Sequence, residues 1–372
     1  MKIDTIEVYY VALPLKYPWR TSYGEDYDIH SVLVKATGEG QVGWAETTPF
    51  YAPCYSPETA MSAFLNIKEF LAPAIVGVDL ESAEAVNQQI AVFKGNQFAK
   101  AGVEIAWWML SAKLQNKPLH ELLGGTRKVV DAGADFGVQD SIDMLLGKIE
   151  KALDKGHKRV KLKAKPGWDL NMLQAVRGSF PNATFHIDCN SGYTLDDAPL
   201  FQKIDKLGLA MIEQPLFHTD LLEHAELQKK LETPICLDES IKNIRDMEWA
   251  IRLNSCRYVN IKSGRVGGLH NAVAIHNLAM DAGIPAWVGG MLESGIGGGI
   301  NNELATLSDF VYPNDLFPTS VFYEQDLTEP ELVLNEDCTF SASEVAGTPY
   351  EPVEERIKKV TKQYAKVDAK DK

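Results

Sequence analysis

The 372-residue sequence lacks the long apolar runs that mark membrane proteins and secreted precursors. No run of about 18 apolar residues occurs, so we expect no membrane span. In the N-terminal stretch MKIDTIEVYYVALPL, Asp4 and Glu7 interrupt any apolar core of the kind that a signal peptide requires. We therefore expect a protein that is neither inserted in a membrane nor exported through such a signal.

The sequence also lacks an excess of basic residues. It contains 37 Lys and Arg against 51 Asp and Glu, for a formal net charge of −14, and no basic block precedes the C-terminal tail. Nucleic-acid-binding proteins need concentrated positive charge to contact phosphates. The charge balance therefore predicts no nucleic-acid partner.

Cysteine is scarce, and its pattern fits neither a disulfide framework nor a zinc site. The number is odd and the spacing is not that of metal ligands. The five cysteines are Cys54, Cys189, Cys236, Cys256 and Cys338. We therefore expect a reducing, cytoplasmic location.

What is present is typical of a globular protein, with 45% hydrophobic and 24% charged residues. A chain of this length predicts one large barrel or two domains. Strand patterns at 3–15, 30–38 and 41–46 precede mainly helical patterns over 58–123, which Gly124-Gly125 ends. These patterns predict an α+β domain over residues 1–125. The charged final stretch TKQYAKVDAKDK is expected to fray.

From about residue 129 the pattern changes to short strands separated by amphipathic segments, at about 25 residues per unit. Eight strand-like runs lie at 132–138, 159–165, 184–190, 209–215, 233–240, 257–264, 284–290 and 309–313. Alternating strands and helices favour a parallel sheet, and we predict an α/β fold with a TIM-like (β/α)-barrel over 126–330. A doubly wound open sheet is the alternative, but the first turn lacks the glycines it would need.

The run RVKLKAK has an apolar face and a lysine face, because side chains two apart in a strand point the same way. Lys161, Lys163 and Lys165 share the second face. In a barrel the apolar face meets the outer helices, so the lysines should point inward. If the face met open water instead, the pattern would mean only solubility.

The next four strands each carry a charged residue opposite an apolar face. These residues are Asp188, Glu213, Asp238 and Lys262, spaced 25, 25 and 24 residues apart. The spacing places them at matching depth near the carboxyl ends of the strands, where barrel active sites lie. A single such carboxylate is as often a helix cap or a solvated rim residue. Three on consecutive strands are harder to explain in that way.

Three converging carboxylates repel one another unless a cation lies between them. Oxygen ligands suit a hard ion, so we predict a Mg²⁺ site at Asp188, Glu213 and Asp238, with Mn²⁺ as the alternative ion. Lys163 and Lys262 would face each other across that site. A small carboxylate substrate bound to the metal would then have its α-carbon between two amines. Burial and neighbouring cations favour the neutral, basic form of a lysine.

With these residues in place, the chain resembles the muconate-lactonising-enzyme-like subgroup of the enolase superfamily. The matching features are Lys161-Leu162-Lys163, the three acidic residues and Lys262. Further matches place it nearest the branch of o-succinylbenzoate synthases and N-succinylamino acid racemases. They are KPGWD (165–169), YTLDDAP (193–199), IEQPL (212–216), TPICLDESI (233–241), VNIK (259–262), GRVGG (264–268), GGMLESGIG (289–297) and DLTEP (326–330).

The resemblance implies a (β/α)7β barrel under an α+β capping domain, with residues from about 331 to 372 packing back on the cap. It implies metal-dependent removal of an α-proton by Lys163 to give an enediolate. Lys262 would stabilise that intermediate or deliver a proton from the other face, and Lys161 would lie beside the substrate carboxylate. The outcome would be dehydration to o-succinylbenzoate in menaquinone biosynthesis, with N-succinylamino acid racemisation as a second activity.

The resemblance also implies substrate contacts. Two loops, 18–24 and 48–55, would cover the barrel mouth with aromatic side chains. The expected contacts are Tyr23, Tyr51, Tyr55, Asp135, Asn190, Arg265, Gly290 and Met291. Arg265 matches an arginine of the racemase-capable branch. Asp135 occupies a position where that branch usually has a hydroxyl group, and Gly298 occupies a position where some members have arginine. The identity of the substrate therefore stays open.

Several alternatives remain at this stage. An N-acylamino acid racemase, or another cycloisomerase or epimerase of the subgroup, would use the same enediolate chemistry. A Schiff-base aldolase would need one buried lysine and no metal, and a non-catalytic binding protein would need no facing lysines. The sequence also leaves homo-oligomerisation open.

Overall fold

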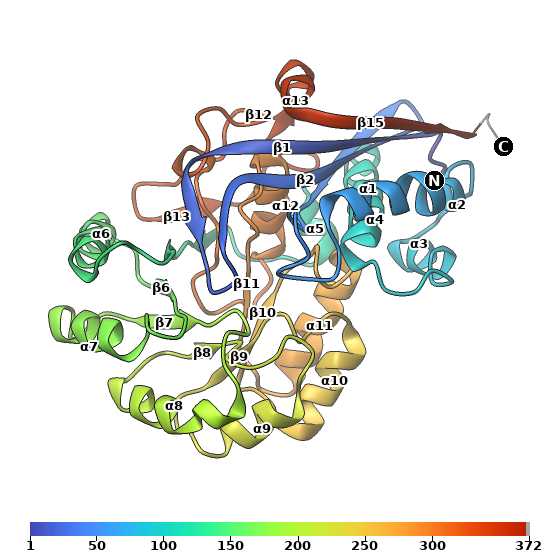
Figure 1. The fold of residues 1–372 in the computed structure, drawn as a ribbon. Coiled ribbons are helices and arrows are strands. Elements are labelled where there is room, and N and C mark those ends of the chain that lie inside the picture. The colour runs from blue at the N-terminus through green and yellow to red at the C-terminus, as the bar shows by residue number, and fades with distance from the viewer. Residues whose placement is uncertain (370–372) are drawn as a thin grey trace.

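The computed structural model describes residues 1–369, and two sheets organise them. One is an antiparallel sheet in the order β15-β1-β2-β3, and the other is a parallel sheet in the order β11-β10-β9-β8-β7-β6-β5. Figure 1 shows the antiparallel sheet as a layer on one side of the parallel one, whose helices lie on its outside. The predicted α/β class with a capped barrel is confirmed.

The cap is built from long strands and one long helix. The chain forms β1 (Thr5–Arg20), β2 (Glu25–Gly38) and β3 (Gln41–Thr47), then α1 (Ala60–Asn66), a π-helical turn (Ile67–Leu71), α2 (Ala72–Ile75), α3 (Ala83–Gln89), α4 (Gln97–Gln115) and α5 (Leu119–Leu123). A Cβ atom at Gly43 would lie 2.3 Å from the backbone nitrogen of Leu110, so glycine lets α4 pack directly on β3. The predicted helix stop is confirmed, because Gly124 takes a φ of +84° after α5.

The C-terminal stretch does not fray as expected. Residues 361–368 form β15 (Thr361–Asp368), which pairs antiparallel with β1 from Thr5 to Val11. Figure 1 shows this red strand beside the blue first strand. Its alternating pattern, with Ala365 buried on one face, is that of an edge strand, and its charges face water. The last three residues of the stretch that was expected to fray, 370–372, lie outside the described residues.

The barrel begins after β4 (Val129–Asp131). Its strands are β5 (Ala134–Phe136), β6 (Val160–Lys163), β7 (Phe185–Asp188), β8 (Ile212–Glu213), β9 (Ile235–Leu237), β10 (Tyr258–Ile261) and β11 (Ala286–Val288). Its helices are α6 (Ile142–Lys155), α7 (Leu170–Ser179), α8 (Ala198–Ile204), α9 (Leu222–Gln228), α10 (Ile244–Leu253), α11 (Leu269–Asp281) and α12 (Gly295–Leu304). The strands follow one another in sequence order without the reversal of a doubly wound sheet, which excludes that alternative.

The predicted eighth strand, 309–313, is not a regular strand. Phe310 bridges Ala286 of β11, and Asn314 bridges Ala132 just before β5, so the segment closes the barrel through isolated contacts. Pro313 has no N–H to donate to a ladder. The side chain of Asn314 takes over part of that role, because its Oδ1 accepts a hydrogen bond of 2.8 Å from the backbone of Val288.

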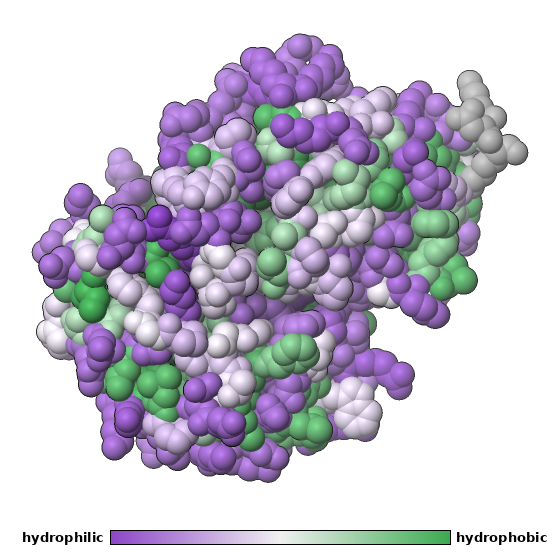
Figure 2. Space-filling model, viewed as in Figure 1, coloured by the Kyte–Doolittle hydropathy of each residue, from purple (hydrophilic) through white to green (hydrophobic). Residues whose placement is uncertain are grey.

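The remaining C-terminal elements are β12 (Thr328–Glu329), β13 (Thr339–Ser341), β14 (Glu351–Pro352) and α13 (Glu354–Val360). β12 pairs with β14, and β13 pairs antiparallel with β4 at the start of the barrel. Among the described residues, no helix combines the length and apolarity needed to cross a membrane. On the face shown in Figure 2, hydrophobic residues reach the surface in separate patches among hydrophilic ones.

Buried carboxylates of the cap hold the barrel helices in place. Glu104 of α4 accepts hydrogen bonds from the backbone of Leu269 (2.8 Å) and His270 (2.9 Å), in the first turn of α11. Glu46 of β3 likewise accepts from the backbone of Ser294 and Gly297 at the start of α12. Carboxylates satisfy the free N–H groups and the dipole at helix N-termini, so the cap is fixed over one side of the barrel mouth.

We expect Glu104→Gln to change how stability depends on pH. Burial raises the pKa of Glu104 from 4.5 to about 7, although its backbone and Trp108 hydrogen bonds lower it. The folded state therefore holds this proton more tightly than the unfolded state. The resulting stabilisation is present below about pH 4.5 and is lost as the pH rises through about 7. Glutamine cannot ionise and removes that contribution.

The stability of the variant relative to the parent protein should therefore be higher at pH 8 than at pH 5, by on the order of 1–3 kcal/mol. Thermal unfolding at both pH values measures this difference. Glu121→Gln, at an exposed glutamate of α5, is the control and should show no such change. An equal offset of Glu104→Gln at both pH values would contradict the interpretation.

Candidate active site at the barrel mouth

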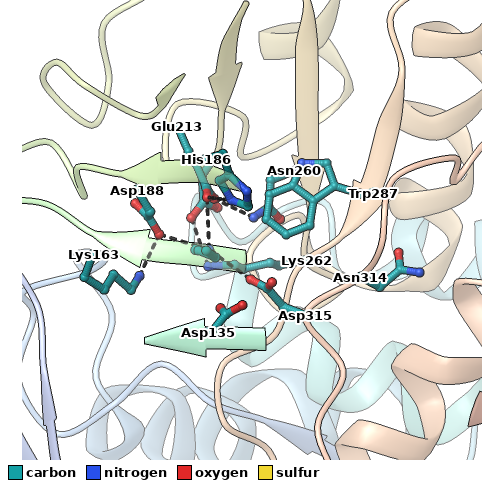
Figure 3. Close-up of polar contacts among 12 residues, drawn as sticks. Asp135, Lys163, His186, Asp188, Glu213, Asn260, Lys262, Trp287, Asn314 and Asp315 are labelled. Atoms are coloured by element: carbon teal, nitrogen blue, oxygen red, sulfur yellow. Dashed lines mark hydrogen bonds and ion pairs between the residues drawn. The ribbon is translucent and has the colours of Figure 1, made fainter. Parts of the chain in front are cut away.

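Strand register places the central residues in one row. Lys163 of β6 lies opposite Asp188 of β7, and Asp188 lies opposite Glu213 of β8. Asp238 follows β9 directly, and Lys262 follows β10. All five side chains are buried at the carboxyl ends of parallel strands, which form a single rim of the barrel. Figure 3 shows Lys163, Asp188 and Glu213 pointing toward one another.

The three carboxylates form one compact cluster. Oxygen atoms of Asp188, Glu213 and Asp238 lie within 4.8 Å of one another. Within residues 1–369 no hydrogen bond reaches the buried Glu213 Oε2, whose polar neighbours are the Lys161 ammonium at 3.0 Å and His186 Nε2 at 3.4 Å. A buried cluster of oxygen ligands with spare acceptor capacity fits a hard divalent cation.

A lysine contacts this cluster from either side. Lys163 Nζ donates to Asp188 Oδ2 (2.6 Å) and to Asn190 Oδ1 (2.9 Å). Lys262 Nζ donates to Asp238 Oδ2 (2.9 Å) and lies 4.4 Å from the centre of the Tyr55 ring. Because β6 and β10 flank the three strands that bear the carboxylates, the two amines approach the same space from different directions.

Lys161 lies deeper in the barrel than the other two lysines. Its Nζ forms ion pairs with Asp188 (3.0 Å), Glu213 (3.0 Å) and Asp315 (2.9 Å). Burial lowers the pKa of Lys161, but the facing carboxylates outweigh it and raise that pKa well above its ordinary value. Lys161 is therefore a fixed positive charge beside the acidic cluster.

A small chamber of about 30 Å³ lies above these residues. Its wall includes four of the expected contacts from the barrel, Asp135, Asn190, Gly290 and Met291. The two covering loops contribute Trp19, Tyr23, Phe50 and Tyr55. A larger cavity of about 550 Å³ adjoins the chamber and shares Trp19, Asp135 and Phe317 with it. Aromatic side chains thus line the mouth on the cap side.

Tyr51 was expected in this wall, and the structure places it elsewhere. Phe50 is buried and faces the chamber, whereas Tyr51 is 67% exposed and packs on His30, with ring centres 4.9 Å apart. Phe50 takes a φ of +70°, which turns the chain so that the neighbouring side chains diverge. The expectation for Tyr51 is therefore corrected to Phe50.

Arg265 was also expected to contact substrate, but the structure buries it behind Asp238. Its Nη1 donates to Asp238 and to Tyr55 Oη, its Nε to the carbonyl of Ile241, and its Nη2 to the carbonyl of Asn260. With all three nitrogens occupied, Arg265 orients the Asp238 carboxylate and does not line the chamber.

Asp135 lines the chamber as expected, but it is not a free anion. Arg159 Nη1 donates to its Oδ1 at 2.5 Å. Burial and the neighbouring Asp315 raise the pKa of Asp135 to about 7, against the opposing effect of Arg159. Its wall of the chamber is therefore less negative than the sequence indicates.

Three charged residues of the site were not identified from the sequence. They are Arg159, Glu239 and Asp315. The same parity that predicts inward lysines also predicts an inward Arg159, two residues before Lys161. Glu239 lies beyond the end of β9, where alternation no longer applies, and its Oε1 accepts from Asn190 (3.2 Å). Asp315 follows the irregular closing segment and has no periodic signal.

The fold and the site define a capped barrel with an acidic cluster between lysines at its mouth. Two family models match: residues 3–124 match the mandelate racemase / muconate lactonizing enzyme N-terminal domain, and residues 145–355 match the enolase C-terminal domain-like model. The chain belongs to the mandelate racemase / muconate lactonizing enzyme family of the enolase superfamily, which confirms the resemblance seen in the sequence.

Named relatives cover nearly the whole chain. An o-succinylbenzoate synthase of Geobacillus kaustophilus is 39% identical to this protein, and the match covers 99% of this chain and 98% of the relative's chain. An N-succinylamino acid racemase of Thermus thermophilus is 42% identical to this protein, and the match covers 89% of this chain and 90% of the relative's chain. The crystal structure of an enolase superfamily member from Listeria innocua matches with a TM-score of 0.94 at 35% identity, covering 99% of both chains.

We expect the acidic cluster to make stability depend on a divalent cation. A ligand that binds only the folded state adds about 2.7 kcal/mol at 100 times its dissociation constant. Adding Mg²⁺ or Mn²⁺ to metal-depleted protein should therefore raise the Tm, and chelation should reverse the rise. Glu213→Gln should remove most of it, because one of three charged ligands is lost.

The control is Glu58→Gln, which removes a buried carboxylate that caps α4 in the cap. That variant should keep the cation-induced rise, whatever its basal Tm. A rise of the same size in Glu213→Gln would show that the cation binds elsewhere.

Proposed function

We propose that the protein is a Mg²⁺-dependent enzyme that removes a proton α to a carboxylate and forms an enediolate. The principal reaction in this proposal is syn-dehydration to o-succinylbenzoate, as in menaquinone biosynthesis, with N-succinylamino acid racemisation as a second activity. The observation that carries the proposal is the row Lys163–Asp188–Glu213, with Asp238 and Lys262 completing the rim. Relatives named for both reactions, at 39% and 42% identity, support it.

The acidic cluster would bind Mg²⁺ or Mn²⁺ through Asp188, Glu213 and Asp238. When bound, such an ion polarises a substrate carboxylate and stabilises the negative charge that develops as the α-proton leaves. The protein's own part is to hold the three ligands. Arg265 and Tyr55 both donate to Asp238, and Asn260 Nδ2 donates to Glu213 Oε1 at 2.7 Å. These bonds fix the orientation of the ligands before substrate enters.

Lys163 is the proposed base. Its amine reaches the chamber directly, beside the ligand Asp188 and the wall residue Asn190. In a syn elimination the α-proton and the hydroxyl leave from the same face of the ring. The ammonium of Lys163, formed by taking the first proton, can therefore return it to the departing hydroxide, which leaves as water.

Lys262 is the proposed partner on the other face. Burial lowers its pKa, but Tyr55, Glu213 and Glu239 outweigh that effect and hold the pKa above its ordinary value. A protonated Lys262 stabilises the enediolate in the dehydration. In racemisation the same ammonium would deliver a proton to the face opposite Lys163, which inverts the α-carbon.

The chamber walls support a substrate with an acyl arm. The aromatic residues Trp19, Tyr23, Phe50 and Tyr55 offer an apolar cover, and Met291 continues it on the barrel side. Because Arg159 pairs with Asp135, the wall there does not exclude a second carboxylate. This geometry is compatible with a succinyl group in either proposed substrate.

One experiment can distinguish dehydration from racemisation, and both reactions from a non-catalytic binding protein. The protein is incubated in D₂O with Mg²⁺ and either the hydroxycyclohexadiene carboxylate precursor of o-succinylbenzoate or an N-succinylamino acid, and NMR follows both. Dehydration appears as the aromatic product, and racemisation appears as deuterium at the α-carbon with loss of optical purity. No reaction of either substrate at any metal concentration would contradict the proposal and favour a binding protein.

We expect Lys163→Ala to abolish α-proton exchange while divalent-cation binding persists. General-base catalysis is worth about 10²–10⁴-fold, so turnover should fall by at least that range. NMR exchange and a Mn²⁺ titration measure the two properties. Lys165→Ala is the matched control, because Lys165 lies beyond the end of β6 and does not line the chamber. Exchange near the parent level in Lys163→Ala would refute the assignment of the base.

We expect Lys262→Ala to separate the two enantiomers of an N-succinylamino acid. Exchange should persist for the enantiomer whose α-proton faces Lys163 and fall for the other, so racemisation stops while one-sided deuteration continues. NMR with each pure enantiomer measures this. Equal losses for both enantiomers would show that Lys262 does not transfer the proton on the face opposite Lys163.

A further inference from the structure

Lys161 has an unusual set of partners. Its ammonium lies 2.9–3.0 Å from three carboxylates, of which Asp188 and Glu213 belong to the acidic cluster and Asp315 does not. Its other neighbour is the Trp287 ring, whose centre lies 5.0 Å away. Of the three carboxylates, only that of Asp315 lies outside the cluster, so it can stay paired with Lys161 when the cluster binds a cation.

The backbone fixes Asp315 where its side chain can meet Lys161. Its N–H donates to the carbonyl of Val288 on β11 at 2.9 Å. The residue before it, Asn314, bonds to the backbone of Asp131 and Gly133 on the β5 side. On the chamber side, a Cβ atom at Gly290 would lie 2.5 Å from the carbonyl oxygen of Asp315, so only glycine allows this close approach. The segment that closes the barrel therefore holds Asp315 from both sides.

A second cation orients the Asp315 carboxylate. Arg159 Nη2 donates to Asp315 Oδ1 at 2.6 Å, while Lys161 donates to Asp315 Oδ2 at 2.9 Å. Arg159 also pairs with Asp135, so two cations and two carboxylates alternate along this wall. Figure 3 shows Asp135 and Asp315 on the side of the site away from Asp188. Each oxygen of Asp315 thus has its own cationic partner.

We propose that Asp315 is a positioning residue that shares the Lys161 ammonium with the acidic cluster, and that it supplies the counter-charge of Lys161 when Asp188 and Glu213 bind the cation. Without Asp315, the Lys161 ammonium has only the two cluster carboxylates as counter-charges. It would then compete with a divalent cation for them. The inference rests on the metal site of the proposed function, and it names a role for the irregular closing segment of the barrel.

The test is a Mn²⁺ titration of the metal-depleted protein, followed by electron paramagnetic resonance of free Mn²⁺. Asp315→Asn keeps the shape of the side chain and removes its charge. Loss of such an outer partner typically weakens metal binding by about 10- to 100-fold, and we expect a loss in that range. Circular dichroism and the Tm establish that the variant is folded.

A double-mutant cycle shows whether the effect acts through Lys161. In a Lys161→Met background the competing ammonium is absent, so adding Asp315→Asn should weaken Mn²⁺ binding by less than about threefold. Asp135→Asn is the matched control, because Asp135 shares the partner Arg159 but forms no ion pair with Lys161. It should change Mn²⁺ affinity by less than about threefold as well.

Three results would overturn the proposal: an unchanged Mn²⁺ affinity in Asp315→Asn, an equal loss in the Lys161→Met background, or an equal loss in Asp135→Asn. The last two results would indicate that the lost negative charge weakens Mn²⁺ binding at a distance, without acting through Lys161. A failure of the proposed function would look different. The parent protein would then bind Mn²⁺ with the expected coupling between Lys161 and Asp315, but would exchange no α-proton.

Discussion

The repulsion among three buried carboxylates is the constraint on which the site depends. Asp188, Glu213 and Asp238 place their oxygens within 4.8 Å, and such an arrangement is costly unless positive charge surrounds it. Cationic side chains supply that charge: Lys161 and Lys163 on one side, Lys262 and Arg265 on the other. The same groups that make the cluster possible are those that the proposed chemistry uses.

The cap and the closing segment convert that cluster into an enclosed site. Glu46 and Glu104 tie the cap to the first turns of α12 and α11, which keeps the aromatic loops over the mouth. Opposite them, the irregular segment around Asn314 closes the barrel and delivers Asp315 to Lys161. An irregular segment can place a charge there because its side chains need not follow the alternation of a strand.

Alternation within the strands allowed much of this site to be predicted. It identified the inward residues of β6 to β10, since one face of each strand must meet the helices. It was less informative where strands end: Lys165 lies past β6, and the buried basic residues are Lys161 and Lys163 of β6 and Arg159 just before it. Glu239 and Asp315 lie in loops, whose tertiary contacts have no period. Tyr51 was misplaced because a left-handed φ at Phe50 cannot be inferred from composition.

A crystal structure of the Mn²⁺ complex with an N-succinylamino acid, using the anomalous signal of manganese, tests the central claim most directly. We predict one manganese peak in contact with Asp188, Glu213 and Asp238, with the substrate α-carbon between Lys163 and Lys262. Lys161 should remain on Asp315. A manganese peak outside the acidic cluster, or an α-carbon beyond the reach of Lys163, would contradict it.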